Sequence, residues 1–259
     1  NLIFNISSGC NKEIFHPNIN QEDNLLREKN LGPYILYCGA SDDRKNLKRL
    51  IQSYSLLKDN LKAIYKLILV CDMEASAGDI YYWRDQFEIS DDQLLLMDFV
   101  TDKELASLYR NCSLFVFPSM YEGFGLPVLE AMSCGAPVIA SNTASIPEIL
   151  GESTYTFNPY KIDEITLLIE NCLENQILLN NLKTNSKERS SFFSWDNTAN
   201  LVLEKLEQLV KSKKSNSIRF DDWNMISEYK RSSYNLILDS LSCDLVNCLD
   251  DIYSKKLVR

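Results

Sequence analysis

Short apolar runs alternate with segments of helical hydrophobic period from about residue 32 to residue 157. In the first helical segment, apolar side chains recur at the spacing of one helix face, at Leu47, Leu50, Ile51, Tyr54 and Leu57. The apolar runs predict buried strands at residues 33–39, 65–72, 93–100, 113–118, 136–141 and 154–157. Parallel strands need crossover connections, which are usually helices. We therefore expect an α/β fold with a Rossmann-like parallel sheet flanked by helices.

Helices become dominant after the last predicted strand. Further helical segments are predicted at residues 80–89, 101–112, 146–150, 162–175, 176–188 and 195–211. In one of them Thr101 is followed three residues later by Glu104, which matches a capping box that starts a helix. A polar linker at 211–217 precedes two amphipathic segments. We expect a loop-like segment at 1–30, a Rossmann-like domain at 31–210 and a helical C-terminal extension at 211–259.

Composition excludes several classes of protein. The formal net charge is −9 and the pI is about 4.8, which argues against a nucleic-acid partner, because phosphate backbones require concentrated lysine and arginine. Eight cysteines occur without a CxxC pair and beside only one histidine, so we expect reduced thiols, no disulfide framework and no metal site. No signal peptide and no membrane-spanning apolar run is visible. These features predict a cytoplasmic chain.

The most informative stretch runs from Ser119 to Ser141. It sets Glu122 and Glu130 eight positions apart around the turn Gly123-Phe124-Gly125. Ligands of open parallel sheets gather at the carboxyl ends of the strands, where this turn is predicted to lie. Helix-start amides attract phosphate, and carboxylates accept hydrogen bonds from sugar hydroxyls. The pattern predicts a ligand with hydroxyls at both ends and phosphates between them, which is a nucleotide sugar.

The loop after the first predicted strand supplies cations for those phosphates. It begins at Gly39 and carries Arg44 and Lys45 directly before a helix. An ordinary solvated helix start would look similar, but the two glutamates of the later stretch favour a role in ligand binding. We therefore place both cations at the phosphate site.

Other ligand-binding patterns fit less well. No GxGxxG follows the first strand, so a dehydrogenase is disfavoured, and Asn46 stands where a P-loop would need serine or threonine. The acid pairs Asp42-Asp43 and Asp91-Asp92 lack the spacing of a D-x-D metal motif. A hydrolase with two catalytic carboxylates is also disfavoured, because nothing predicts a sugar-binding cleft of that kind.

Three stretches, at residues 6–15, 39–51 and 99–149, resemble the C-terminal, donor-binding domain of a GT-B glycosyltransferase of family 4. The resemblance implies that residues 1–30 form an interdomain connection. It implies that Glu122 lies by the donor sugar and that Lys45 neutralises the pyrophosphate. Glu130 would bind ribose, and the base would lie near Phe99 and Val100. The remaining binding residues implied are Gly39, Arg44, Gly123, Phe124, Gly125 and Leu126.

The resemblance also implies a chemistry. The sugar would be transferred with retention at its anomeric carbon, without an essential metal, in the synthesis of a bacterial polysaccharide or lipopolysaccharide. GDP-mannose is the expected donor, with UDP sugars as the alternative. Many relatives carry arginine where this chain has Ala40, so we expect Arg44 to supply the second positive charge.

The resemblance implies that the chain corresponds to one of the two domains of a GT-B enzyme. We expect the N-terminal acceptor domain to be missing from this chain, and we expect no transfer activity without it. The extension at 211–259 would contact a second copy or a partner protein, and the full-length enzyme would lie peripherally at the inner face of the membrane. The alternative is a noncatalytic module that binds a partner glycosyltransferase.

Overall fold

The computed structural model describes residues 4–17, 31–98, 100–151 and 155–212. These residues belong to two compact units, one spanning Cys10–Phe192 and one containing residues 4–9 and 193–212. The predicted extension lies outside the described residues from position 213 onward, as do Phe99 and much of the segment 1–30.

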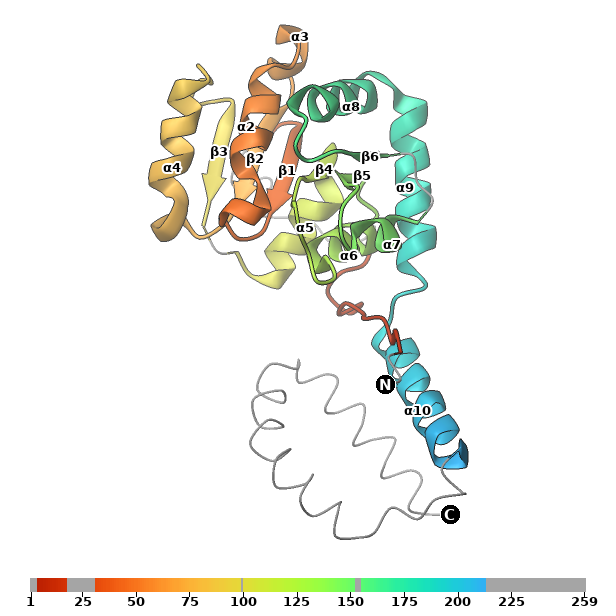
Figure 1. The fold of residues 1–259 in the computed structure, drawn as a ribbon. Coiled ribbons are helices and arrows are strands. Elements are labelled where there is room, and N and C mark those ends of the chain that lie inside the picture. Colours follow the sequence, from red (N-terminus) through yellow and green to blue (C-terminus); the bar gives the residue numbers. More distant parts are fainter. Residues whose placement is uncertain (1–3, 18–30, 99, 152–154, 213–259) are drawn as a thin grey trace. The chain divides into compact units, whose positions relative to one another are not determined.

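A six-stranded sheet forms the centre of the larger unit, and all its neighbouring strands are parallel (Figure 1). The strand order is β3-β2-β1-β4-β5-β6. The strands are β1 (Tyr34–Cys38), β2 (Lys66–Val70), β3 (Leu94–Met97), β4 (Leu114–Phe117), β5 (Val138–Ser141) and β6 (Thr156–Phe157). The predicted α/β class and parallel Rossmann-like sheet are confirmed.

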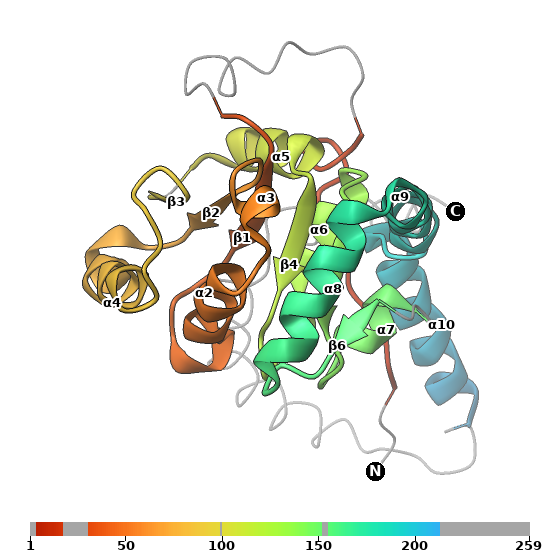
Figure 2. The ribbon, with the colours of Figure 1, turned by 90° about the horizontal axis from the view of Figure 1, so that it is seen from above.

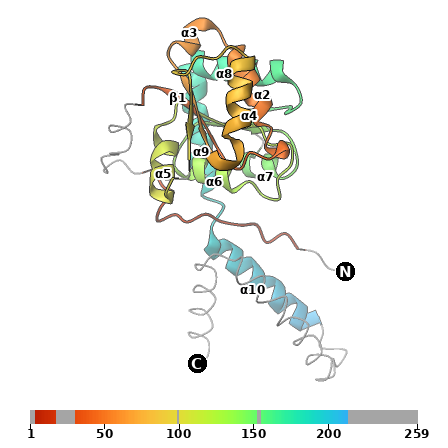
Figure 3. The same cartoon turned by 90° about the vertical axis from the view of Figure 1, so that its left-hand side faces the viewer.

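Helices cover both faces of this sheet. The helical elements of the larger unit are η1 (Asp43–Lys45), α2 (Leu47–Ser55), α3 (Asp59–Lys62), α4 (Met73–Gln86), α5 (Asp102–Asn111), α6 (Leu126–Ser133), α7 (Ile146–Leu150), α8 (Ile162–Glu174) and α9 (Gln176–Ser190). Helix α2 packs against α4 and α8, whereas α6 packs against α5 and α9. Figures 2 and 3 show α2 and α4 on the opposite side of the sheet from α5. The smaller unit contains α10 (Trp195–Ser212).

Local sequence signals explain several helix starts. The capping box is confirmed: the amide of Glu104 donates to Thr101 Oγ1 at 3.3 Å, and the amide of Thr101 donates to Glu104 Oε2 at 2.7 Å. The prediction for α4 was wrong at its start, because the helix begins at Met73 and not at residue 80. Its first turns are rich in small residues, and the side chain of Asp72 caps them by accepting from the Ala75 amide at 3.1 Å. The short helix α3 was not predicted.

The core lies between the sheet and its helices. Every residue of β4 is buried, as expected for a strand covered on both faces. Aromatic rings continue this packing: Tyr37 stacks on Phe117, Phe117 on Phe115, and the Tyr109 ring meets Phe115 edge-on at 5.2 Å. This rigid centre fixes the strand ends from which the site loops emerge. Among the described residues, no helix is long and apolar enough to cross a bilayer.

Candidate functional site

The strand order places a topological switch point between β1 and β4, and we expect the ligand crevice there. These strands are neighbours, yet β1 leads toward α2 on one face of the sheet and β4 leads toward α6 on the other. Loops that part in this way leave a gap at the carboxyl ends of the strands, where open α/β sheets bind ligands. The loop 39–46 follows β1 and the loop 118–125 follows β4. The two stretches singled out in the sequence therefore face one crevice.

A short ion pair joins the two loops. Lys45 Nζ donates to Glu122 Oε1 at 2.7 Å, and each side chain is only 10% exposed. The same ammonium lies 5.3 Å from the centre of the Phe117 ring. Two charges removed from water in this way stabilise each other, and each would be costly alone. The structure thus brings together the two residues predicted to act in catalysis.

Arg44 contributes to the site through its backbone. Its carbonyl oxygen accepts hydrogen bonds from the Met120 amide at 2.7 Å and from the Ser119 hydroxyl at 3.1 Å. Its guanidinium, half exposed, donates to Asp42 Oδ1 at 3.0 Å and Oδ2 at 3.3 Å. The hydrogen bond to Asp42 and the charge of that carboxylate raise the pKa of Arg44. A phosphate contact by this side chain stays a prediction.

Asn46 is a supporting residue that sequence reasoning missed. It adopts a left-handed backbone conformation with φ 63° between η1 and α2. Its Nδ2 donates to the Pro118 carbonyl at 3.0 Å and to the Pro159 carbonyl at 2.8 Å, and its Oδ1 accepts from Arg49 at 2.8 Å. The amide therefore ties the loops after β1, β4 and β6 together around Lys45.

The glycine turn before α6 is fixed by packing on one side and open on the other. Gly125 has φ +110°, and a Cβ there would lie 2.6 Å from Ile146 Cδ1. The Ser145 hydroxyl lies 2.6 Å from the Phe124 carbonyl and 3.0 Å from that of Glu122. A Cβ at Gly123 would meet no atom within 4 Å, which leaves space beside Glu122.

Helix α6 carries two further predicted residues. It opens at Leu126, which is 42% exposed. Pro127 has no N–H and the Val128 amide donates to the Gly125 carbonyl at 3.0 Å, so the Leu126 amide is the first-turn donor left for a ligand. Glu130 lies one turn further on, half-buried, and its Oε2 accepts from the Tyr109 hydroxyl at 3.3 Å. Burial raises the pKa of Glu130 to about 7; the Tyr109 hydrogen bond opposes the rise and the charge of Asp102 adds to it. Tyr109 was not predicted.

Glu130 and Lys45 both lie near the end of β1. The Cys38 thiol there has its pKa raised to about 12, chiefly by burial; the Tyr109 hydroxyl lowers it, Glu130 raises it and Lys45 lowers it. The charges of Glu130 and Lys45 therefore both act at this strand end, and Glu122 is held by Lys45 through their ion pair. This placement agrees with one ligand extending from Glu122 to Glu130.

Two predicted residues lie at the edge of this arrangement. Gly39 directly follows β1 with φ +152°, and the Tyr37 hydroxyl donates to the Ala40 carbonyl at 2.7 Å. Val100 is half-buried between β3 and α5. The described residues contain no group of three or more His, Cys, Asp or Glu side chains that could hold a metal ion.

Comparison with known proteins decides the family. The family model described as "Glycosyl transferases group 1" matches residues 18–189 of this chain. The chain belongs to this family. The match covers nearly all of the Rossmann-like unit, including both loops of the crevice, so the predicted membership among GT-B glycosyltransferases is confirmed.

Individual glycosyltransferases resemble this chain over most of its length. The "Serotype-specific mannosyltransferase WbdA" of Escherichia coli is 36% identical over 214 residues, which are 81% of this chain and 26% of that protein. The structure of sucrose-phosphate synthase from Thermosynechococcus elongatus has a TM-score of 0.66 at 26% identity and covers 80% of this chain, which spans 52% of it.

A third similar structure is Anabaena Alr3699/HepE in complex with UDP-glucose. It has a TM-score of 0.66 at 18% identity over 77% of this chain and 56% of its own, and this likeness concerns the fold alone. This glycosyltransferase chain thus spans about a quarter of its first curated relative and about half of the similar structures.

Proposed function

We propose that this chain is the donor-binding domain of a retaining glycosyltransferase that builds a bacterial polysaccharide or lipopolysaccharide. The observation that carries the proposal is the buried pair of Lys45 and Glu122, which joins the loops after the neighbouring strands β1 and β4, with Glu130 one turn into α6. A cation, two carboxylates and a helix start around one gap suit a nucleoside diphosphate sugar.

Each part of such a donor has a counterpart in the crevice. The diphosphate would lie between Lys45 and the start of α6, where positive charge and the Leu126 amide favour anions. Ribose hydroxyls would donate to Glu130, and the hydroxyls of the transferred sugar would donate to Glu122. Val100 would border the base.

The chemistry follows from charge. When the glycosidic bond to phosphate breaks, negative charge grows on the leaving diphosphate. Lys45, Arg44 and the Leu126 amide at the start of α6 would stabilise it, and Glu122 would orient the sugar. Charge stabilisation by these groups supports transfer without an essential metal, and activity that survives EDTA in the full-length enzyme would test this. Retention would be tested by the anomeric configuration of the product.

GDP-mannose is the proposed donor, because the mannosyltransferase WbdA is similar over 81% of this chain. UDP sugars are the alternative, supported by the UDP-glucose complex of Alr3699/HepE. The acceptor would be bound by an N-terminal domain, and we propose that the chain alone does not transfer sugar. Residues 211–259 would serve contacts with a second copy or with a partner.

Thermal stabilisation tests the proposal directly. A ligand that binds only the folded chain raises its free energy of unfolding, by about 2.7 kcal/mol at one hundred times the Kd. We expect GDP to raise the melting temperature more than UDP, ADP or GMP do. Lys45→Ala should abolish the effect, whereas Lys48→Ala, a change at an exposed lysine of α2, should preserve it. No stabilisation by any nucleoside diphosphate at millimolar concentration would favour a noncatalytic module.

A further inference from the structure

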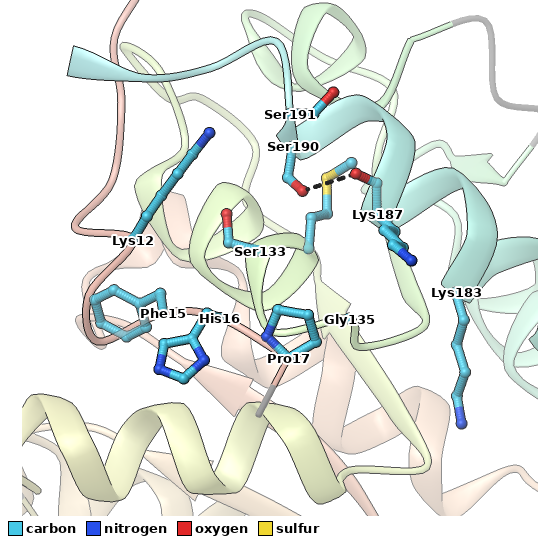
Figure 4. Close-up of a pocket in the computed structure, with 11 residues that line it drawn as sticks. Lys12, Phe15, His16, Pro17, Ser133, Gly135, Lys183, Lys187, Ser190 and Ser191 are labelled. Atoms are coloured by element: carbon cyan, nitrogen blue, oxygen red, sulfur yellow. Dashed lines mark hydrogen bonds between the residues drawn. The ribbon is translucent and has the colours of Figure 1, made fainter. Parts of the chain in front are cut away.

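A second concavity lies at the carboxyl end of α6, away from the crevice at its amino end. It encloses about 370 Å³ (Figure 4). Its walls come from the N-terminal segment 12–17, from the end of α6 with the turn at Gly135, and from one face of α9. Helix α6 has 8 residues and is therefore about 12 Å long. The pocket and the crevice are thus separate places on the same unit.

The polar lining of this pocket is positively charged. Lys12 reaches it from the N-terminal segment, and Lys183 and Lys187 line it from α9 (Figure 4). No aspartate or glutamate belongs to the lining. Within the described part of the chain, none of the three lysines forms an ion pair. Lys183 and Lys187 stand four residues apart on one helix face, where like charges repel. An anion would relieve this repulsion, in a chain whose net charge is −9.

The rest of the lining combines His16 and three serines with an apolar wall that is held in place. Phe15 is 5% exposed and its ring lies 6.1 Å from that of Tyr109. Met132, on α6, is fully buried, and Pro17 closes the same side. The Ser133 hydroxyl, also in the lining, lies 3.1 Å from the Cys10 thiol and connects the N-terminal segment to α6. The apolar wall is therefore formed before any ligand arrives.

We propose that this pocket binds an anionic amphiphile, that is, a phosphate group attached to an apolar chain. The ends of Lys12 and Lys183 point apart in Figure 4, but all three lysines are exposed, and their flexible side chains can turn toward a phosphate as compact point charges. The exposed Pro17 and the edge of Phe15 cover the first carbons of the chain, with the buried Met132 behind them, and burial of apolar surface there adds affinity. A wholly polar anion leaves this wall in water. A lipid headgroup and a free alkyl phosphate share this chemistry.

Calorimetric titration with short-chain lipids tests the proposal. Dihexanoyl phosphatidic acid, kept below its micellar concentration, is the probe. It should bind the chain tighter than inorganic phosphate and tighter than dihexanoyl phosphatidylcholine. The double variant Lys183→Ala/Lys187→Ala should weaken binding about tenfold or more, as loss of charge-assisted contacts predicts. The charge-matched control Lys48→Ala/Lys103→Ala changes two exposed lysines elsewhere and should leave binding unchanged.

Further arms separate the outcomes. Lys12→Ala removes a cation from a different wall of the pocket and should also weaken binding. This result would show that the weaker binding of the double variant does not come from a change in α9 alone. GDP should not displace the probe, because the nucleotide crevice lies elsewhere; displacement would overturn the assignment whether or not the crevice binds GDP. Equal affinity for phosphate and phosphatidic acid, or for the two lipids, would overturn it as well.

Phosphatidylcholine vesicles containing phosphatidic acid show whether the ligand is a lipid headgroup or a free amphiphile. If the chain binds these vesicles and the double variant Lys183→Ala/Lys187→Ala does not, the ligand is a lipid headgroup. If the double variant still binds the vesicles, the proposal is overturned. If the chain binds the soluble probe but not the vesicles, the ligand is a free amphiphile.

Discussion

The ion pair between Lys45 and Glu122 gives a sharp prediction, because the chain carries a second pair of the same length in a different setting. Lys161 Nζ also lies 2.7 Å from a glutamate oxygen, Oε1 of Glu164. The side chains of the first pair are each 10% exposed, and those of the second are 62% and 43% exposed. The two pairs differ in burial and not in contact distance.

We expect Glu122→Gln to lower the free energy of unfolding by about 3 kcal/mol, the low end of the range for removing one partner of a buried pair. The low end applies because the glutamine oxygen still accepts a hydrogen bond from Lys45. For a folded unit of this size, that loss corresponds to a decrease of about 6–12 °C in Tm. Glu164→Gln is the matched control and should change Tm little, because water and salt screen its charge.

Thermal unfolding followed by circular dichroism measures both variants. The loss in Glu122→Gln should persist at high salt, since a buried pair is poorly screened. GDP should restore part of it, because a diphosphate provides a new counter-charge for Lys45. Equal changes in Tm for the two variants would refute the argument that burial decides the strength of the pair.

Three further predictions concern the surroundings of this pair. Gly125→Ala should destabilise the chain by about 2 kcal/mol or more, since the φ of +110° and the 2.6 Å approach of Ile146 both oppose a side chain. Gly123→Ala is the control, because a Cβ there meets no atom within 4 Å. Equal melting curves for the two variants would contradict this prediction. The pKa of Glu130 is raised from 4.5 to about 7, so between these two pH values the folded chain binds more protons than the unfolded chain. The free energy of unfolding should therefore fall as the pH rises from 4.5 to about 7. The affinity for GDP should rise over the same range, because Glu130 becomes ionised. Urea titrations should show that Glu130→Gln removes this slope, and an unchanged slope would assign it to other groups. Asn46→Ala should lower both Tm and GDP affinity, because two loop carbonyls lose their donor; a normal GDP affinity would limit Asn46 to a role in stability.

Much of the fold is predictable because its signals are local. The strands are continuous apolar runs, and the capping box of Thr101 and Glu104 fixes the start of α5 from four residues alone. The start of α4 escaped prediction because Met73–Gln86 carries few buried side chains, only Ser76 and Ile80, and so has no clear helical period. Where a helix buries few side chains, the hydrophobic pattern does not predict it.

The candidate site is predictable only in part. Lys45 and Glu122 stand 77 residues apart, but each lies in the loop that follows a strand, so the rule that ligands gather at strand ends brings them together. Asn46 escaped prediction because its contact with Pro159 spans 113 residues and depends on where β6 ends. Tyr109 escaped because its spacing fits an ordinary buried helix face, and only the tertiary structure shows its hydroxyl at Glu130.

The most direct test of the central claim is a crystal structure of this chain with GDP. The account predicts that the diphosphate lies within hydrogen-bonding distance of Lys45 Nζ, at the first turn of α6, with the ribose hydroxyls on the Glu130 carboxylate. A nucleotide bound elsewhere, with the pair of Lys45 and Glu122 untouched, would contradict it.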